Sequence, residues 1–262
     1  MSERYLHGHH DSVLRSHRWR TAENSAAYLL DRLRPGLDLL DVGCGRATIT
    51  AELAARVAPG RVLGIDASAE VVAEASAAHP GLDLRVADLM ALPLEAASFD
   101  VVHAHQVLQH VADPVGALRE AARVLRPGGI VAARDSIYAS KAWAPDDPLL
   151  VRWNELYHQV ARRDGGEPDA GRYLLAWTAA AGFVDATYTT STWTFADDAT
   201  RAWWGGLWAE RAVASSFAPH ALEHGLSDRA ELEAIADAFR RWSAAPGSVF
   251  VVVHGEVVAH RP

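Results

Sequence analysis

Short apolar runs alternate with helical patterns over residues 39–137, and this alternation limits the fold more than any other feature of the chain. The runs are rich in β-branched residues, and between them apolar residues recur at helical spacing, as Ile49, Leu53 and Val57 do. Strands that alternate with helices form a parallel sheet with crossover helices. We therefore predict an α/β fold. Its first five strands are expected at residues 39–42, 61–65, 82–87, 99–105 and 129–137.

The segments on either side of this stretch are mostly helical in pattern. Residues 10–34 predict two helices, and the second begins after Thr21 as its N-cap and ends before Pro35 and Gly36. Beyond residue 137, four helices are expected at residues 148–163, 171–181, 197–213 and 227–242, with strands at 186–193 and 249–258. No repeat or linker separates a second part, so we expect one domain over residues 1–262.

Composition narrows the classes of partner. A chain of 262 residues that is 50% hydrophobic can bury a large core. Its formal charge of −8 disfavours nucleic acid and anionic membranes as partners, because both bind to clustered Lys and Arg. The sequence has no run of about 18 apolar residues and no apolar signal segment at its start, and Cys44 is its one cysteine. We expect a cytoplasmic monomer or homodimer that acts on a small molecule.

The segment LLDVGCGRATIT, residues 39–50, joins the first predicted strand to the first helix. Such a loop lies at the carboxyl edge of the sheet, where α/β folds bind ligands. Gly43 and Gly45 allow a ligand to approach the main chain, and amides at the start of the next helix face a polar ligand group. Asp66 ends the second strand, where a carboxylate can accept hydrogen bonds from two ribose hydroxyls. An adenosine-containing ligand is implied.

Two ligand classes share this geometry. The dinucleotide pattern requires Gly or Ala at the position of Thr48, which weakens a nicotinamide interpretation. Asp41, just before the glycines, would repel a pyrophosphate but attract a ligand that carries an ammonium group. A methyl-donor cofactor and a nicotinamide cofactor both remain as hypotheses, and the first fits Asp41 better.

At this point the chain resembles the class I S-adenosylmethionine-dependent methyltransferases. Asp41-x-Gly43-x-Gly45 matches the first motif of that family, Asp66 its ribose-binding acid, and Asp88-Leu89 its adenine-edge contact. The runs FDVV at 99–102 and LRPGG at 125–129 match its fourth strand and the turn before the fifth. Ala47 stands where the family usually has a third glycine. The resemblance implies a Rossmann-like, doubly wound sheet of seven strands, mostly parallel, with the last strand antiparallel.

A finer resemblance rests on three segments. HHDSVL at 9–14, HRWRTAENSAAYL at 17–29 and HAHQVLQH at 103–110 are similar to a ubiquinone/menaquinone-type subgroup, some members of which methylate sulfurs of dithiol natural products. The resemblance implies lid helices over residues 1–36, a cofactor-binding core over 37–137 and acceptor-pocket helices with the final strands over 138–262. Arg20, on a lid helix, is expected to pair with the methionine carboxylate of the cofactor.

The candidate residues follow from these motifs. For the cofactor, S-adenosyl-L-methionine, we expect contacts from Arg20, Asp41, Gly43, Gly45, Asp66, Ala67, Asp88, Leu89, His105 and Gln106. For catalysis we name His105 and His110, because the fourth strand ends beside the transferred methyl group. A base is optional for a thiol acceptor. His7, His9 and His10 are interpreted as a solvated segment rather than a metal site, and no metal is expected.

Tryptophans point to the acceptor side. Eight of the nine follow residue 140, and most are expected in the core. Trp203 and Trp204 are adjacent and cannot both face inward on one helix, so a pocket for an apolar or aromatic acceptor is plausible there. The sequence therefore predicts a small-molecule methyltransferase of secondary metabolism. A nicotinamide-dependent oxidoreductase and a non-catalytic cofactor-binding protein are the alternatives.

Overall fold

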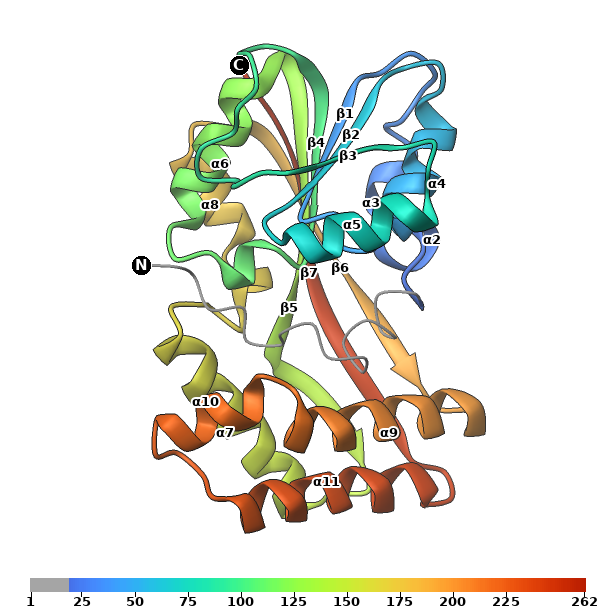
Figure 1. Ribbon diagram of the computed structural model, residues 1–262, viewed down its shortest axis with the longest axis vertical. Helices are drawn as coiled ribbons and strands as arrows, with labels where there is room; N and C mark the ends of the chain where they lie inside the picture. The colour runs from blue at the N-terminus through green and yellow to red at the C-terminus, as the bar shows by residue number, and fades with distance from the viewer. Residues whose placement is uncertain (1–18) are drawn as a thin grey trace. The chain divides into compact units, whose positions relative to one another are not determined.

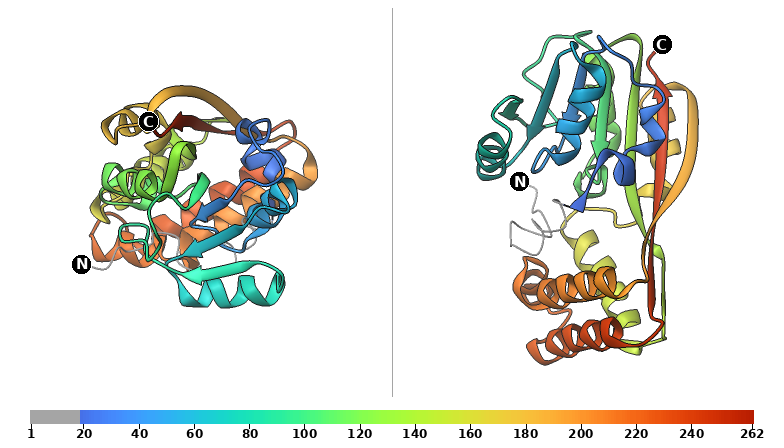
Figure 2. Two further views of the ribbon diagram at one scale, coloured as in Figure 1. Left: turned by 90° about the horizontal axis from the view of Figure 1, so that it is seen from above. Right: turned by 90° about the vertical axis from the view of Figure 1, so that its right-hand side faces the viewer.

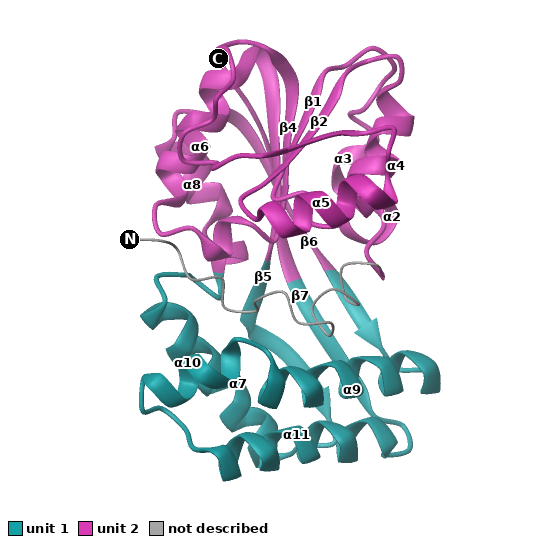
Figure 3. Ribbon diagram, viewed as in Figure 1, with its two compact units in different colours: residues 1–16, 136–169, 192–253 teal, residues 17–135, 170–191, 254–262 magenta. Residues whose placement is uncertain are grey.

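The computed structural model describes residues 19–262, and their contacts gather in two compact units. Of the described residues, unit 1 contains 136–169 and 192–253, and unit 2 contains 19–135, 170–191 and 254–262 (Figure 3). Three strands continue from one unit into the other along the chain. Unit 2 carries the glycine loop and every described residue that the sequence analysis assigned to the cofactor.

One mixed sheet of seven strands has the order β3-β2-β1-β4-β5-β7-β6 (Figure 1). Its pairs β1–β2, β2–β3, β1–β4 and β4–β5 are parallel, and one strand of the sheet is antiparallel. This arrangement confirms the predicted fold class. The strands are β1 (Leu39–Val42), β2 (Val62–Asp66), β3 (Asp83–Val86), β4 (Phe99–His105), β5 (Leu125–Ala144), β6 (Val184–Phe195) and β7 (Val249–His260).

The helices begin where the sequence supplies a cap. Ser68 accepts from the amide of Val71, and Asp113 from that of Gly116, so that each satisfies a donor left open at a helix start. The helices of unit 2 are α2 (Ala22–Ser25), α3 (Ala27–Leu30), α4 (Thr48–Val57), α5 (Ala69–Ala78), η1 (Leu108–His110), α6 (Pro114–Val124), η2 (Ala170–Arg172) and α8 (Leu174–Ala180). Those of unit 1 are α7 (Pro148–Arg163), α9 (Asp198–Ala214), α10 (Phe217–Glu223) and α11 (Arg229–Ala244).

Helices cover both faces of the sheet within unit 2 (Figure 2). One apolar cluster joins α6 and α8 to strand residues such as Val102 and Val131. A second cluster joins α2, α3 and α4 to Leu39, Val101 and Ala132 on the opposite face. Alternate residues of a strand face opposite sides, which is why neighbours 101 and 102 enter different clusters. The doubly wound arrangement holds the loop after β1 between these two layers.

Aromatic side chains fill the core of unit 1. The Trp153 ring lies 4.5 Å from Trp208 and 5.0 Å from Phe239, and all three are buried. Lys141 is buried among these rings, with Nζ 2.9 Å from the centre of the Tyr138 ring. Burial, with Arg211 nearby, lowers the pKa of Lys141 well below its usual value. The adjacent tryptophans behave as predicted, since Trp204 is buried and Trp203 only partly so.

The N-terminal region differs from the prediction within the described residues. Thr21 does cap a helix, and its side chain and that of Asn24 bond to each other's backbone amides. The helix then breaks at Ala26, whose φ of −136° is not helical, and a second short helix follows. Arg20 precedes the cap, so the prediction that it sits on a helix is wrong. The remaining lid residues, through 18, lie outside the described residues.

Other boundaries moved by small amounts. Strand β5 is longer than predicted, because the buried residues after Gly129 continue the extended pattern past Ile137. The predicted helix 171–181 is a 3-10 turn followed by α8, and α10 was not predicted. The short helix α10 has Pro219 in its first turn, where proline is tolerated.

Candidate cofactor site

The loop after β1 has a left-handed backbone at alternate residues. Gly43, Gly45 and Ala47 have φ of 63°, 54° and 59°. A Cβ at Gly43 would lie 2.4 Å from the side chain of Val107, so glycine is required there for space as well as for φ. Ala47 takes the third left-handed position as the N-cap of α4, with its methyl group buried. The loop thereby brings backbone amides to the start of α4, as the sequence analysis expected.

Asp41 is a buried carboxylate at the end of β1. Its Oδ2 accepts a hydrogen bond from Thr50 Oγ1 at 2.5 Å, and its Oδ1 lies 2.7 Å from His103 Nδ1. A carboxylate has about four acceptor positions, so these two bonds leave capacity for a ligand donor. Because Asp41 also lines the pocket described below, it can offer that capacity to an ammonium group.

Asp66 ties the glycine loop to β2. Its Oδ2 accepts from the Gly45 amide at 3.1 Å, and its Oδ1 accepts from the Ser68 amide at 3.0 Å. Ala67 lies between them and is exposed. Asp66 is half-buried, so its remaining lone pairs can still reach a diol. Asp66 ends β2 as predicted, and its contact with a ribose stays a prediction.

A pocket opens beside this loop in unit 2. Arg20 and Asp41 bring opposite charges to it, and His105 comes from the end of β4. The full lining is Arg20, Asp41, Gly43, Cys44, Gly45, Arg46, Thr48, Ile49 and His105. Five of the predicted residues thus line one pocket, and together they can bind a zwitterionic group.

The other predicted residues are not among those that line the pocket. Gln106 has φ of 55° and bonds to Arg20, one of the lining residues. Asp88 is exposed and accepts from the Met90 amide at 2.8 Å, while Leu89 packs against the core. His110 ends the 3-10 turn η1.

The two predicted catalytic histidines are neutral at physiological pH. Burial, with the Arg20 and Arg134 guanidinium groups nearby, lowers the pKa of His105 well below its usual value. Burial, with Arg20, lowers the pKa of His110 to about 4. A neutral imidazole can accept a hydrogen bond from a substrate group, but one with so low a pKa is a weak base. This favours an acceptor that needs little help to lose its proton.

A buried polar network behind the pocket was not predicted. Arg134 on β5 bonds to Glu256 Oε1 at 3.1 Å and to His254 Nδ1 at 3.0 Å, and all three side chains are buried. Burial raises the pKa of the neighbouring Asp135 carboxyl to about 8, and its Oδ1 accepts from the Gln109 amide. Charged residues inside otherwise apolar predicted strands were the signal that could have revealed this network.

The described residues contain neither a metal centre nor a membrane-spanning helix. Across residues 19–262, no group of three or more His, Cys, Asp or Glu side chains is arranged to hold a metal ion. In the same range, no helix has both the length and the apolar character to cross a membrane. His7, His9 and His10 lie outside the described residues.

Comparison with known proteins agrees with this geometry. A family model described as a methyltransferase domain matches residues 40–133, from β1 into β5. An uncharacterized methyltransferase of Schizosaccharomyces pombe is 31% identical over 269 residues, covering 97% of this chain and 95% of that protein. The chain belongs to the methyltransferase family.

Further relatives match part of the chain. A 27-O-demethylrifamycin SV methyltransferase of Amycolatopsis mediterranei is 42% identical over 130 residues, which cover 44% of this chain and 46% of that protein. A probable methyltransferase of Aspergillus luteorubrus is 35% identical over 149 residues, covering 51% of this chain and 52% of that protein. The chain therefore spans about half the length of these two relatives.

Solved structures share the fold. The YcgJ protein of Bacillus subtilis has a TM-score of 0.59 and 19% identity, covering 91% of this chain and 98% of that one. The [4+2]-cyclase SpnF has a TM-score of 0.52 and 25% identity, covering 92% of this chain and 78% of that one. The second likeness shows that a cyclase is built on this architecture.

Proposed function

We propose that this methyltransferase transfers the methyl group of S-adenosyl-L-methionine to a small apolar or aromatic acceptor of secondary metabolism. One observation carries the proposal: a single pocket of unit 2 combines the left-handed glycine loop with Asp41 and Arg20 of opposite charge. A methionine moiety carries an ammonium and a carboxylate, so it matches that pair. The secondary-metabolism relatives support the choice of acceptor class.

The residues present fit this cofactor. In the proposed arrangement Asp41 accepts from the ammonium group, Arg20 binds the carboxylate and Asp66 binds the ribose, with Ala67, Asp88 and Leu89 toward the adenine. Gly43 lines the pocket, and its loop conformation needs glycine because a Cβ there would clash with Val107. When bound, the cofactor supplies an electrophilic methyl group on a sulfonium.

The chain itself contributes position and exclusion of water. Methyl transfer is an in-line displacement, so orientation of the acceptor behind the methyl carbon accounts for much of the rate. His105 and His110, both neutral, hydrogen-bond or orient the acceptor in this proposal rather than act as strong bases. A thiol or acidic hydroxyl suits such a site, which agrees with the ubiquinone/menaquinone-type resemblance.

The first experiment is a pair of calorimetric titrations of the purified chain, one with S-adenosylhomocysteine and one with NADH. Micromolar binding of S-adenosylhomocysteine alone is expected. Binding of NADH alone would overturn the proposal in favour of an oxidoreductase.

The second experiment tests turnover. The chain and S-adenosyl-L-methionine are incubated with thiol, phenol and amine acceptors, and S-adenosylhomocysteine and methylated products are measured by mass spectrometry. Equal amounts of both products are expected for at least one class. Cofactor binding without product from every class would favour a non-catalytic or rearranging protein, as the cyclase neighbour illustrates.

A further inference from the structure

The Asp41 carboxylate at the pocket is held by donors from two other elements of unit 2. Strands β1 and β4 are parallel neighbours, and their register makes His103 the cross-strand partner of Asp41. Partners in register point to the same face of a sheet, and His103 Nδ1 lies 2.7 Å from Asp41 Oδ1. Thr50, in the first turn of α4, donates to Asp41 Oδ2 at 2.5 Å. Each carboxylate oxygen is therefore tied to a different element.

The surroundings of the His103 ring determine where its hydrogen lies. The ring is fully buried, and its Nδ1 faces a carboxylate, which only accepts, so Nδ1 carries a hydrogen. Its Nε2 is also buried and has no hydrogen-bond partner among residues 19–262. An imidazolium would place a second N–H group there without an acceptor, which is unfavourable. The neutral tautomer with hydrogen on Nδ1 therefore fits this site.

A neutral His103 leaves the negative charge of Asp41 in place. The ring supplies a hydrogen bond to the carboxylate but no opposite charge. Arg46, which lines the same pocket, pairs with Glu74 at 2.7 Å instead. Asp41 is nearly fully buried and lines the pocket, so its open acceptor positions can meet a ligand there. A buried charge favours a partner of opposite charge, and a ligand cation can be that partner.

We propose that His103 is a positioning residue, which fixes the Asp41 carboxylate for a ligand ammonium group and leaves its negative charge to that group. His103 acts through Asp41 rather than on the ligand. Because Thr50 holds the other oxygen, the carboxylate is already oriented before a ligand binds. His103 thereby makes the pocket select ligands that carry an amine. This inference rests on the proposed function, in which Asp41 accepts from the ammonium group of the cofactor.

Two variants of His103 test this role in calorimetric titrations with S-adenosylhomocysteine and with its deaminated analogue, which keeps the carboxylate and the nucleoside. The wild-type chain should bind S-adenosylhomocysteine about tenfold more tightly than the analogue, the scale of one charged hydrogen bond. His103→Leu removes the donor, so the carboxylate can turn away from the ammonium. Its affinity for S-adenosylhomocysteine should fall about tenfold, and its affinity for the analogue less than about threefold. His103→Asn keeps an N–H group near the position of Nδ1 and should retain most of the preference.

The matched control is Thr178→Val, which removes another buried hydrogen bond of unit 2, from the hydroxyl to the Leu174 carbonyl, and should leave the preference unchanged. The inference is overturned by a His103→Leu variant that keeps the preference or loses both ligands equally, or by a His103→Asn variant that behaves like His103→Leu. A wild-type chain that binds both ligands equally also overturns it and leaves cofactor binding standing. A wild-type chain that binds neither ligand overturns the proposed function instead.

Nitrogen NMR of the wild-type chain provides a reading that does not depend on the folding of any variant. His103 should be neutral with hydrogen on Nδ1, both in the free chain and with S-adenosylhomocysteine bound. An imidazolium in either state would overturn the inference, because a charged ring would neutralise Asp41. The spectrum of the free chain decides the tautomer whether or not a ligand binds, so this result is separate from that of the proposed function.

Discussion

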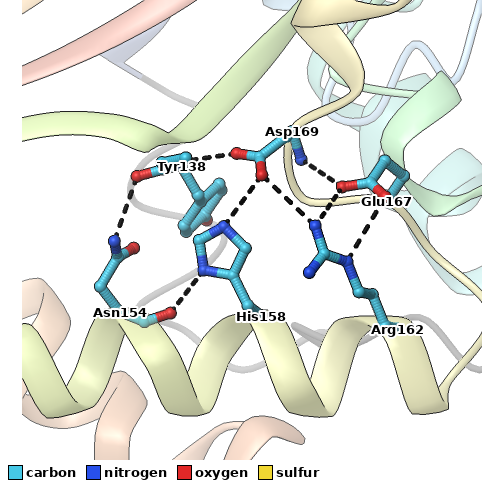
Figure 4. A network of polar contacts seen from close by, with 7 residues as sticks. Tyr138, Asn154, His158, Arg162, Glu167 and Asp169 are labelled. Carbon is cyan, nitrogen blue, oxygen red and sulfur yellow. Dashed lines mark hydrogen bonds and ion pairs between the residues drawn. The ribbon is translucent and has the colours of Figure 1, made fainter.

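Each unit contains a network of polar side chains, and the two networks differ in burial. In unit 1, His158 Nδ1 donates to the Asn154 carbonyl and Nε2 to Asp169 Oδ2, so both N–H groups of the imidazolium have acceptors (Figure 4). Arg162 bonds to Glu167 and Asp169 in the same network, and its side chain is exposed. In unit 2, Arg134, Glu256 and His254 bond to one another and are all buried.

This difference separates a partly exposed network in unit 1 from a buried one in unit 2. The contacts of His158 and Asp169 join α7 to the loop after it, beside aromatic side chains such as Tyr138. The buried contacts of Arg134 continue through His254 and Gln106 to Arg20, which lines the pocket. The unit 2 network therefore reaches the candidate cofactor site.

The largest expected effect is a loss of stability in unit 1 that leaves the affinity of the cofactor pocket nearly unchanged. Trp153→Ala removes a fully buried ring in contact with Trp208 and Phe239, so it should lower the free energy of unfolding by about 3–5 kcal/mol. Its affinity for S-adenosylhomocysteine, measured by calorimetry where the variant is folded, should change less than about threefold, because the pocket residues belong to unit 2.

Chemical denaturation measures the loss of stability, and Trp203→Ala is the control because that ring is only partly buried in the same unit. Equal losses for both variants would contradict the assignment of Trp153 to the core. A large loss of cofactor affinity in folded Trp153→Ala would show that the two regions are not independent.

Most of the fold could be predicted from sequence, because it depends on local patterns. The strand ends at Val42, Asp66 and His105 follow from apolar runs that stop at a glycine or at polar residues, and the cap at Ser68 follows from residue type. The break at Ala26 could not be predicted, since alanine favours helices and only tertiary packing opposes it there.

The candidate site was predictable where one motif holds it and not where distant strands meet. Asp41, Gly43 and Gly45 share a short loop, so their association is local. The Arg134 network joins β5 to β7, and 120 positions in the sequence separate Arg134 from His254. Pairing over such a separation depends on strand order, which a periodic pattern does not contain.

A smaller effect is expected in unit 2, where a substitution should change ligand affinity. Asp66→Ala should weaken S-adenosylhomocysteine binding by about 1–3 kcal/mol, through loss of charge-assisted hydrogen bonds to the ribose. Calorimetric titration measures it, with Asp83→Ala on β3 as the control for removal of a carboxylate elsewhere in unit 2.

Asp66 also holds the Gly45 and Ser68 amides, so a second variant separates the loop from the ligand. Asp66→Asn keeps one amide acceptor and should retain the stability of the loop better than Asp66→Ala. An unchanged dissociation constant in both variants would remove Asp66 from the proposed ribose contact.

The smallest expected effect is a pH dependence of stability that arises from the His158 and Asp169 network of unit 1. Burial opposes a charged His158, but its hydrogen bonds to Asp169 and to the Asn154 carbonyl outweigh burial and raise its pKa. Burial likewise opposes a charged Asp169, and the His158 and Ala139 hydrogen bonds outweigh it and lower the pKa of that carboxyl. A raised imidazole pKa contributes stability below its unfolded value of about 6.5, and a lowered carboxyl pKa contributes above its unfolded value of about 3.9.

The two contributions therefore overlap between about pH 4 and 6.5, and the imidazole part is lost as pH rises through the raised pKa of His158. His158→Gln, which cannot become cationic, should differ most from the wild-type chain in Tm within that window and progressively less in more alkaline buffer. Thermal unfolding of both proteins across this range measures the difference and cancels the titration of other groups. A Tm difference that grows toward alkaline pH would mean that His158 is neutral in the folded chain. The His158 and Asp169 network of unit 1 would then contain no imidazolium donor.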